Sequence, residues 1–251
     1  DRHVHVEAAL TSGHVCEVYA EGISEEEPSR FSLDRLVPGS EAWLNYIIGV
    51  VAVYKDSGIA VPAFRARIWS DLPTGAGLSS SAALETGIAL VLEGLSGIEQ
   101  EVVDRALLCQ RAEHEFAGVP CGIMDQMAVG AGRAGMVMKL DCRDHSRKYF
   151  DLPAGISILI ADTGVHHSLG DGEYKKRRHD CETVLGILQA ESFRELSLGS
   201  LQEHRALLDD RLFRRARHAV TEMERVRRFS IALEKGGVDP LGRLMRASHE
   251  S

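Results

Sequence analysis

Residues 73–83 read Pro73-Thr74-Gly75-Ala76-Gly77-Leu78-Ser79-Ser80-Ser81-Ala82-Ala83. Upstream of this stretch, residues 63–70 alternate apolar and polar side chains, a pattern typical of a half-buried strand. Downstream, residues 79–94 are rich in Ala and Leu, which favours a helix. The stretch therefore predicts a glycine-rich loop that leaves a strand and opens a helix.

This loop has the composition of an anion-binding site. Its glycines let the backbone approach a ligand closely, and the free N–H groups and the dipole of a helix start favour a negative charge. Three serine hydroxyls add donors and a group able to bind a metal. The simpler alternative is a serine-capped helix after a glycine turn, without a ligand. We favour phosphate binding because eleven consecutive residues carry the pattern.

Three familiar loop motifs do not match these residues. No Lys follows the last glycine, as a P-loop requires, and Ser80 stands where a dinucleotide fingerprint needs its third Gly or Ala. The GxSxG pattern of a nucleophile elbow fails at Ser81. A serine hydrolase that uses Ser79 or Ser81 with His114 and Asp125 is therefore a weak alternative.

Strand and helix patterns alternate along the rest of the chain. The predicted helices are Glu41–Ser57, ended by Gly58, then Ser79–Gly94, Glu99–Phe116, 121–132 and most of the chain after Glu173. The predicted strands are one or two within residues 1–20, then Ala63–Ser70, Val137–Leu140, Lys148–Leu152 and Ile156–Asp162. Such a mixture predicts an α/β or α+β protein.

The composition is that of a folded protein and excludes several classes of partner. The 251 residues include 29 Lys and Arg against 37 Asp and Glu, a net charge of −8, which argues against nucleic-acid binding. The basic clusters at Lys175–Arg178 and at Arg214, Arg215 and Arg217 are interpreted as solvated helix faces. No apolar stretch approaches the ~20 residues that span a bilayer. Five scattered cysteines without CxxC spacing favour a reducing cytoplasm over a disulfide framework or a zinc site.

Glu113 falls on an apolar helix stripe. It lies four residues after Cys109 and three before Phe116, in line with Val102 and Ala106. A carboxylate on such a face is costly unless a charge or a metal satisfies it, and Mg²⁺ typically takes one or two carboxylates together with substrate phosphates. The alternative is a Glu at a helix end that reaches solvent or a buried Arg. The spacing alone leaves both interpretations open.

Asp125 lies in residues 121–129, a segment otherwise almost free of charge. On a helical wheel it falls off the apolar stripe of Ile123, Met124, Met127 and Ala128, so it need not be buried. A polar-face Asp or helix cap and a reactive carboxylate are both compatible with this position.

The sequence resembles the GHMP kinases. Residues 73–83 resemble the second conserved motif of that family, and Ala112-Glu113-His114-Glu115-Phe116-Ala117-Gly118-Val119-Pro120-Cys121-Gly122-Ile123-Met124-Asp125-Gln126 is similar to its galactokinase branch. The similarity continues in family order through His167-Ser168-Leu169, Glu173-Tyr174 with Arg177-Arg178, Arg215-Ala216-Arg217-His218 and Thr221-Glu222. The resemblance implies a two-domain α+β fold, with a ribosomal-S5-domain-2-like N-terminal domain over 1–153 and a ferredoxin-like C-terminal domain over 154–251.

The resemblance also implies roles for individual residues. It implies that Ser81 and Glu113 hold Mg²⁺ against the phosphates of ATP. It implies that Asp125 is the catalytic carboxylate facing the anomeric hydroxyl of a sugar, and that Gly122 and Tyr174, with Asp125, contact that sugar. The residues that it assigns to ATP binding are Gly75, Ala76, Gly77, Leu78, Ser79, Ser80 and Ser81.

The implied function is ATP-dependent phosphorylation of the anomeric hydroxyl of galactose to galactose 1-phosphate. A kinase for another sugar, such as N-acetylgalactosamine or arabinose, is one alternative, and a non-catalytic sugar and ATP sensor on the same fold is another. The intact serine loop and Asp125 favour a kinase over a sensor. His166 stands where the family often carries Arg or Lys, which predicts a weaker fixed positive charge there because His is mostly neutral near pH 7.

Both ends of the sequence read as internal to a longer protein. Residue 1 is Asp rather than Met, and the last residues show no cap or helix breaker. The first family motif, which reads the sugar, and the third, glycine-rich motif are not found in the sequence. We therefore interpret the chain as a fragment with little or no kinase activity of its own. The expected partner is a small sugar, with no nucleic acid or membrane, and the expected state is a cytoplasmic monomer.

Overall fold

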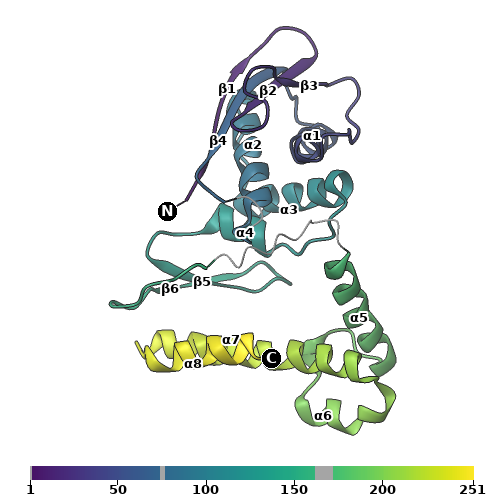
Figure 1. The fold of residues 1–251 in the computed structure, drawn as a ribbon, viewed down its shortest axis with the longest axis vertical. Coiled ribbons are helices and arrows are strands. Elements are labelled where there is room, and N and C mark those ends of the chain that lie inside the picture. Colours follow the sequence, from purple (N-terminus) through teal and green to yellow (C-terminus); the bar gives the residue numbers. More distant parts are fainter. Residues whose placement is uncertain (1, 74–76, 162–171) are drawn as a thin grey trace. The chain divides into compact units, whose positions relative to one another are not determined.

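The computed structural model describes residues 2–73, 77–161 and 172–251 (Figure 1). These residues form two compact units. The first comprises 2–73, 77–132, 140–147 and residue 161, and the second comprises 133–139, 148–160 and 172–251. The mixture of strands and helices confirms the predicted α+β class. The domain boundary predicted at 153/154 stays a prediction.

Within the described residues, the first unit is built on a four-stranded sheet with the order β1-β4-β2-β3. Strand β4 is antiparallel to β1 and parallel to β2, and β2 is antiparallel to β3. The alternation predicted along β4 is confirmed, because Phe64, Ala66 and Ile68 are buried while Arg65 and Arg67 are exposed. The strands are β1 (Val4–Leu10), β2 (Val15–Ala20), β3 (Ser29–Ser32) and β4 (Phe64–Ser70).

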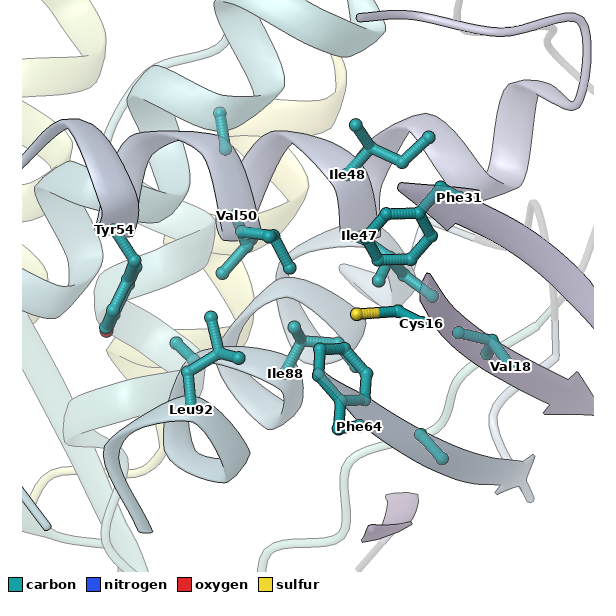
Figure 2. Packing of buried hydrophobic residues seen from close by; sticks show 14 of the residues in the cluster. Cys16, Val18, Phe31, Ile47, Ile48, Val50, Tyr54, Phe64, Ile88 and Leu92 are labelled. Carbon is teal, nitrogen blue, oxygen red and sulfur yellow. The ribbon is translucent and has the colours of Figure 1, made fainter. Parts of the chain in front are cut away.

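Helices α1 (Ala42–Asp56), α2 (Ser80–Ser96) and α3 (Val102–Ala112) share one hydrophobic cluster with this sheet. Figure 2 shows its centre, where Cys16 and Phe64 of the sheet meet Ile47 of α1 and Ile88 of α2. The predicted start and end of α1 are confirmed to within a residue. Gly58 follows the helix at φ +83°, a left-handed conformation that costs glycine little. The cluster therefore anchors α2 to the sheet.

A buried polar link joins the three helices. Arg105 of α3 forms a bidentate pair with Glu93 of α2, with Nε–Oε1 and Nη2–Oε2 distances of 2.8 and 2.6 Å. The hydroxyl of Tyr54 in α1 donates to Glu93 Oε1 at 2.7 Å. A buried charge is tolerated only when it is paired and hydrogen-bonded, and the carboxylate meets both conditions. The geometry of this link specifies how the helices lie along one another.

Helix α1 packs closely against the segment after α3 at Gly49. A Cβ atom at this position would lie 2.9 Å from Phe116 Cβ and 3.0 Å from the Ala112 carbonyl oxygen. We expect Gly49→Ala to lower the free energy of unfolding by about 1–2 kcal/mol, since overpacking outweighs the better helix propensity of alanine. Urea unfolding measures the change. The matched variant is Gly94→Ala in α2, where a Cβ meets nothing within 4 Å, and it should gain about 0.5–1 kcal/mol. Equal gains in both variants would contradict the close packing.

The second unit is mostly helical. Val184 of α5 and Leu201 of α6 are buried against Leu212 and Ala216 of α7. Helix α7 begins after Asp209, whose side chain accepts the N–H of Leu212 as a helix cap. The elements after the first unit's helices are β5 (Met136–Leu140), β6 (Arg147–Asp151), α5 (Glu173–Leu188), η2 (Phe193–Glu195), α6 (Leu198–Glu203), η3 (Arg205–Leu207), α7 (Asp210–Glu234) and α8 (Asp239–His249). The strand pair predicted at 137–152 and the helical pattern after Glu173 are confirmed.

One predicted strand is wrong. The sequence predicts a strand over Ile156–Asp162, but residues 156–161 form none, and Leu159 is 90% exposed; Asp162 lies outside the described residues. A strand is stable only when a neighbour satisfies its backbone groups, and no strand in the described ranges pairs with this segment. In the same ranges, no helix is both long and apolar enough to cross a membrane.

Candidate active site

The start of helix α2 carries an unusual backbone conformation. Ser79 precedes the helix at φ +54° and ψ +38°, the left-handed region that non-glycine residues rarely adopt. Its hydroxyl does not cap the helix. It donates instead to Asp125 Oδ1, with an oxygen–oxygen distance of 2.9 Å. The first N–H groups of α2 therefore lack a capping side chain at Ser79, which suits them to an anion. Backbone strain of this kind is concentrated at functional sites.

Glu113 is placed by a break in helix geometry. The sequence predicts one helix over Glu99–Phe116, but α3 ends at Ala112 and continues as a π-helical turn, η1 (Glu113–Ala117), closed by Gly118 at φ +70°. Single π turns often mark functional sites. Glu113 is 3% exposed, so its predicted position on the buried stripe is confirmed.

The Glu113 carboxylate divides its contacts between its two oxygens. Oε1 lies 3.4 Å from the hydroxyl oxygen of Ser81. Oε2 accepts hydrogen bonds from Gln126 Nε2 at 2.8 Å and from the thiol of Cys121 at 3.3 Å. The described residues contain no Lys or Arg within ion-pair distance of Glu113, so the buried-Arg alternative is not supported. Oε2 is thus held by two side chains, and Oε1 faces the Ser81 hydroxyl.

Asp125 and Gln126 lie side by side in the first turn of α4 (Met124–Ala131). Asp125 is half-buried and reaches Ser79, whereas Gln126 is 1% exposed and reaches Glu113. The preceding turn is fixed at the Cys121 carbonyl oxygen, which lies 2.8 Å from His114 Nε2. His114 is thus engaged with the backbone rather than with a serine, and the geometry does not favour the hydrolase alternative.

The site holds several acidic side chains close together, and burial raises the pKa of three of them. Burial raises the pKa of Glu113 above its ordinary value, and the charge of Asp125 raises it further. Burial and the charge of Glu113 together raise the pKa of Glu85, in the second turn of α2, to about 9. Burial also raises the pKa of Cys121 to about 12, so its thiol stays neutral and donates to Glu113. Among the described side chains no cation pairs with these carboxylates, which favours a bound cation.

The donor set fits Mg²⁺ only in part, as expected for a metal bound with a phosphorylated ligand. In the part of the chain that the structure describes, no group of three or more His, Cys, Asp or Glu side chains is placed to hold a metal ion. The Ser81 hydroxyl and Glu113 Oε1 converge to 3.4 Å. Mg²⁺ typically combines one or two carboxylates with substrate phosphates and water. One carboxylate and one hydroxyl are therefore enough ligands from the protein.

The structure brings together some of the predicted residues and not others. Ser79, Ser81, Glu113 and Asp125 converge at the start of α2. Gly77, Leu78 and Ser80 adjoin them in sequence, while Gly75, Ala76 and His166 lie outside the described residues. Gly122 is exposed just before α4. Tyr174 is 52% exposed in α5 of the second unit, and its membership of a sugar site stays a prediction.

Two buried polar residues beside the site, Glu85 and Gln126, were not predicted from the sequence. Glu85 lies four residues after Ser81 and three before the buried Ile88, so a helical wheel places it on the inner face of α2. The predicted stripe in α4 included Met124, which is 61% exposed, and left out Gln126. Because Gln is polar, an apolar pattern could not include it.

Comparisons with known proteins identify the family. Residues 45–133 match the GHMP kinases N terminal domain. The chain is 42% identical over 217 residues to the galactokinase of Bos taurus, covering 86% of this chain and 55% of that protein. It is 36% identical over 257 residues to the galactokinase of Chloroflexus aggregans, covering 100% and 65%. The chain thus spans between about half and two thirds of the length of these relatives.

A solved structure agrees with this match. The crystal structure of Lactococcus lactis galactokinase complexed with galactose superposes with a TM-score of 0.88 at 27% identity, covering 98% of this chain and 66% of that one. The GHMP kinases are ATP-dependent kinases, so this match supports ATP as a ligand. Residues 45–133 therefore belong to the GHMP kinases N terminal domain family, and the chain as a whole is similar to the galactokinases.

Proposed function

We propose that this chain carries the phosphate-binding and catalytic part of a galactokinase, which transfers the γ-phosphoryl group of ATP to the anomeric hydroxyl of galactose. The observation that carries the proposal is the pairing of Ser79 with Asp125, at 2.9 Å, beside the pairing of Ser81 with Glu113, at 3.4 Å. Both pairs lie at an uncapped helix start, in a fold that matches a galactose-bound galactokinase.

In this proposal the ATP phosphates lie at the start of α2. The backbone N–H groups of Ser80 and Ser81 and the dipole of α2 stabilise their charge. The loop residues Gly77, Leu78 and Ser79 let the backbone approach them, together with the predicted Gly75 and Ala76. Phosphoryl transfer depends mainly on positioning and on neutralising charge, and this arrangement supplies both.

We assign the Ser81 hydroxyl and Glu113 as the protein ligands of Mg²⁺. When bound, Mg²⁺ neutralises the phosphate oxygens and the developing charge of the transition state. Gln126 and Cys121 hold the second oxygen of Glu113, which leaves the first directed at Ser81. The carboxylate is therefore oriented before the nucleotide arrives.

Asp125 is the proposed base. It orients the attacking hydroxyl and accepts its proton as the new bond to phosphorus forms. The hydrogen bond from Ser79 keeps one of its oxygens in place, so the other is available to the sugar. Gly122 and Tyr174 are the further proposed sugar contacts.

The experiment that tests this function uses the protein expressed from the complete reading frame that encodes this chain. ADP release is followed with galactose, N-acetylgalactosamine, arabinose and glucose, each with Mg²⁺ and with excess EDTA. Mg²⁺-dependent turnover on galactose supports the proposal. Turnover on another sugar keeps the mechanism and changes the substrate. ATP binding without turnover on any sugar favours the sensor alternative.

The 251-residue chain alone is expected to form little or no galactose 1-phosphate. The chain spans only part of the length of the related galactokinases, and we expect a complete sugar pocket to need residues from the rest of that length. The measurement is product formation by the purified chain beside the protein from the complete reading frame at equal concentration. Robust production by the chain alone would contradict this expectation. The cytoplasmic location and the monomeric state are also proposals, and size-exclusion chromatography tests the second.

A further inference from the structure

Glu85 is a buried carboxylate for which the proposed reaction has no direct use. It is 0% exposed in the second turn of α2. Its Oε2 accepts a hydrogen bond from Gln126 Nε2 at 3.2 Å, and its Oε1 has no partner in the described part of the chain. An uncompensated buried carboxyl group costs stability. Such a cost is common where a side chain serves function rather than folding.

Gln126 links this carboxyl group to the candidate metal ligand. Its amide nitrogen lies 3.2 Å from Glu85 Oε2 and 2.8 Å from Glu113 Oε2. An amide nitrogen carries two hydrogens, so both bonds form at once and fix the rotation of the amide. With its Oε2 held in this way, Glu113 can turn only Oε1 toward Ser81, as observed.

We propose that Glu85 is a positioning residue, which anchors the Gln126 amide so that Glu113 presents one oxygen to the Ser81 hydroxyl. The inference rests on the proposed function, because Ser81 and Glu113 are its Mg²⁺ ligands. Glu85 and Ser81 belong to the same helix, one turn apart, while Gln126 adjoins Asp125 on α4. The hydrogen bond between Gln126 and Glu85 therefore connects α2, whose start is the proposed phosphate site, to the turn of α4 that carries Asp125.

A purely structural role for Glu85 makes a different prediction. If the side chain only filled space, leucine, which has a similar size, would replace it without effect on metal binding, because apolar replacements of buried polar groups are often tolerated. Glutamine keeps a carbonyl oxygen that accepts from Gln126. The pKa of Glu85 is raised to about 9 by burial and by Glu113, so glutamine also matches its neutral form at pH 7.5. Glu85→Leu thus keeps the size of the side chain and removes the hydrogen bond, whereas Glu85→Gln keeps both.

The test compares ATP affinity with and without Mg²⁺ in the protein from the complete reading frame. Isothermal titration at pH 7.5 gives the ATP dissociation constant in excess Mg²⁺ and in excess EDTA. The dissociation constant in EDTA divided by that in Mg²⁺ reports how much the metal adds to ATP affinity. Glu85→Leu and Gln126→Leu should each reduce that ratio about tenfold, as loss of an outer-shell partner of a metal ligand does. Affinity in EDTA should stay the same, and Glu85→Gln should keep the ratio of the unsubstituted protein.

The control is Ile88→Ala, on the same buried face of α2. It should lower the melting temperature and leave the ratio unchanged. A ratio that Glu85→Leu leaves unchanged, or that Ile88→Ala lowers equally, would overturn the positioning role while the proposed kinase function stands. ATP binding that does not depend on Mg²⁺ in the unsubstituted protein would overturn the proposed function, and this inference with it.

Discussion

Replacing Asp125 with asparagine or alanine should lower the rate of sugar phosphorylation by about 10²–10⁴-fold, measured as ADP release in the protein from the complete reading frame. The carboxylate is the group proposed to accept the proton of the attacking hydroxyl, and neither replacement can accept it. Asparagine retains an oxygen that accepts the hydrogen bond from Ser79. A lower rate in Asp125→Asn therefore reports the lost proton transfer and not a lost contact with Ser79.

The affinity for ATP in Mg²⁺ should change little in these variants, because Asp125 is not assigned to the phosphates. The matched control is Asp104→Asn, which also alters an acidic residue in the first turn of a helix but at an exposed position. It should keep the rate of the unsubstituted protein. Retention of more than about a tenth of the rate in Asp125→Asn would be well outside the range of a lost general base and would exclude Asp125 from that role.

The second large effect concerns stability against pH. The pKa of Glu85 is raised from 4.5 to about 9, so between these values the folded chain keeps a proton that the unfolded chain has released. The contribution of Glu85 to the free energy of unfolding is therefore fully present below about pH 4.5. It decreases above that pH and is lost as the pH rises through about 9. Each unit of pKa difference corresponds to about 1.4 kcal/mol, so the loss amounts to several kcal/mol. Glu85→Gln carries no titrating group at this position and should not show it.

Urea unfolding of both proteins at pH 5, 7 and 9 without metal checks this expectation. The free energy of unfolding of Glu85→Gln relative to the unsubstituted protein should rise steadily with pH. Glu113, Tyr46, Cys109 and Cys121 share this environment and are present in both proteins. The difference therefore reports the charge of Glu85 together with its effect on these neighbours. Glu99→Gln, at an exposed position, is the control for replacing a carboxyl group by an amide. A flat difference for Glu85→Gln would show that its carboxyl group ionises normally.

Local patterns predicted most of the elements correctly. The alternation along β4 and the spacing in α1 were sufficient because each element buries one face, and its period appears in the residue order. The prediction of a strand at Ile156–Asp162 was wrong because local spacing does not show whether a neighbouring strand is present. Its apolar residues fit a strand, but a strand also needs a neighbour, and pairing is a property of the whole fold. The π turn at Glu113 was invisible to helical periodicity, since one extra residue in a turn leaves no signature in composition.

The candidate site divides in the same way. The sequence by itself predicts an anion-binding loop over residues 73–83, which stays a prediction. It also predicted the burial of Glu113, which the structure confirms, because burial on one helix face depends on neighbours within one or two turns. Only the tertiary structure decided that the Ser79 hydroxyl turns to Asp125 instead of capping its helix, and that Gln126 joins Glu85 to Glu113. These contacts connect residues 13 to 46 positions apart. A hydrogen bond across such a separation depends on how α2, α3 and α4 pack, and packing is set by the whole core rather than by any stretch of the chain.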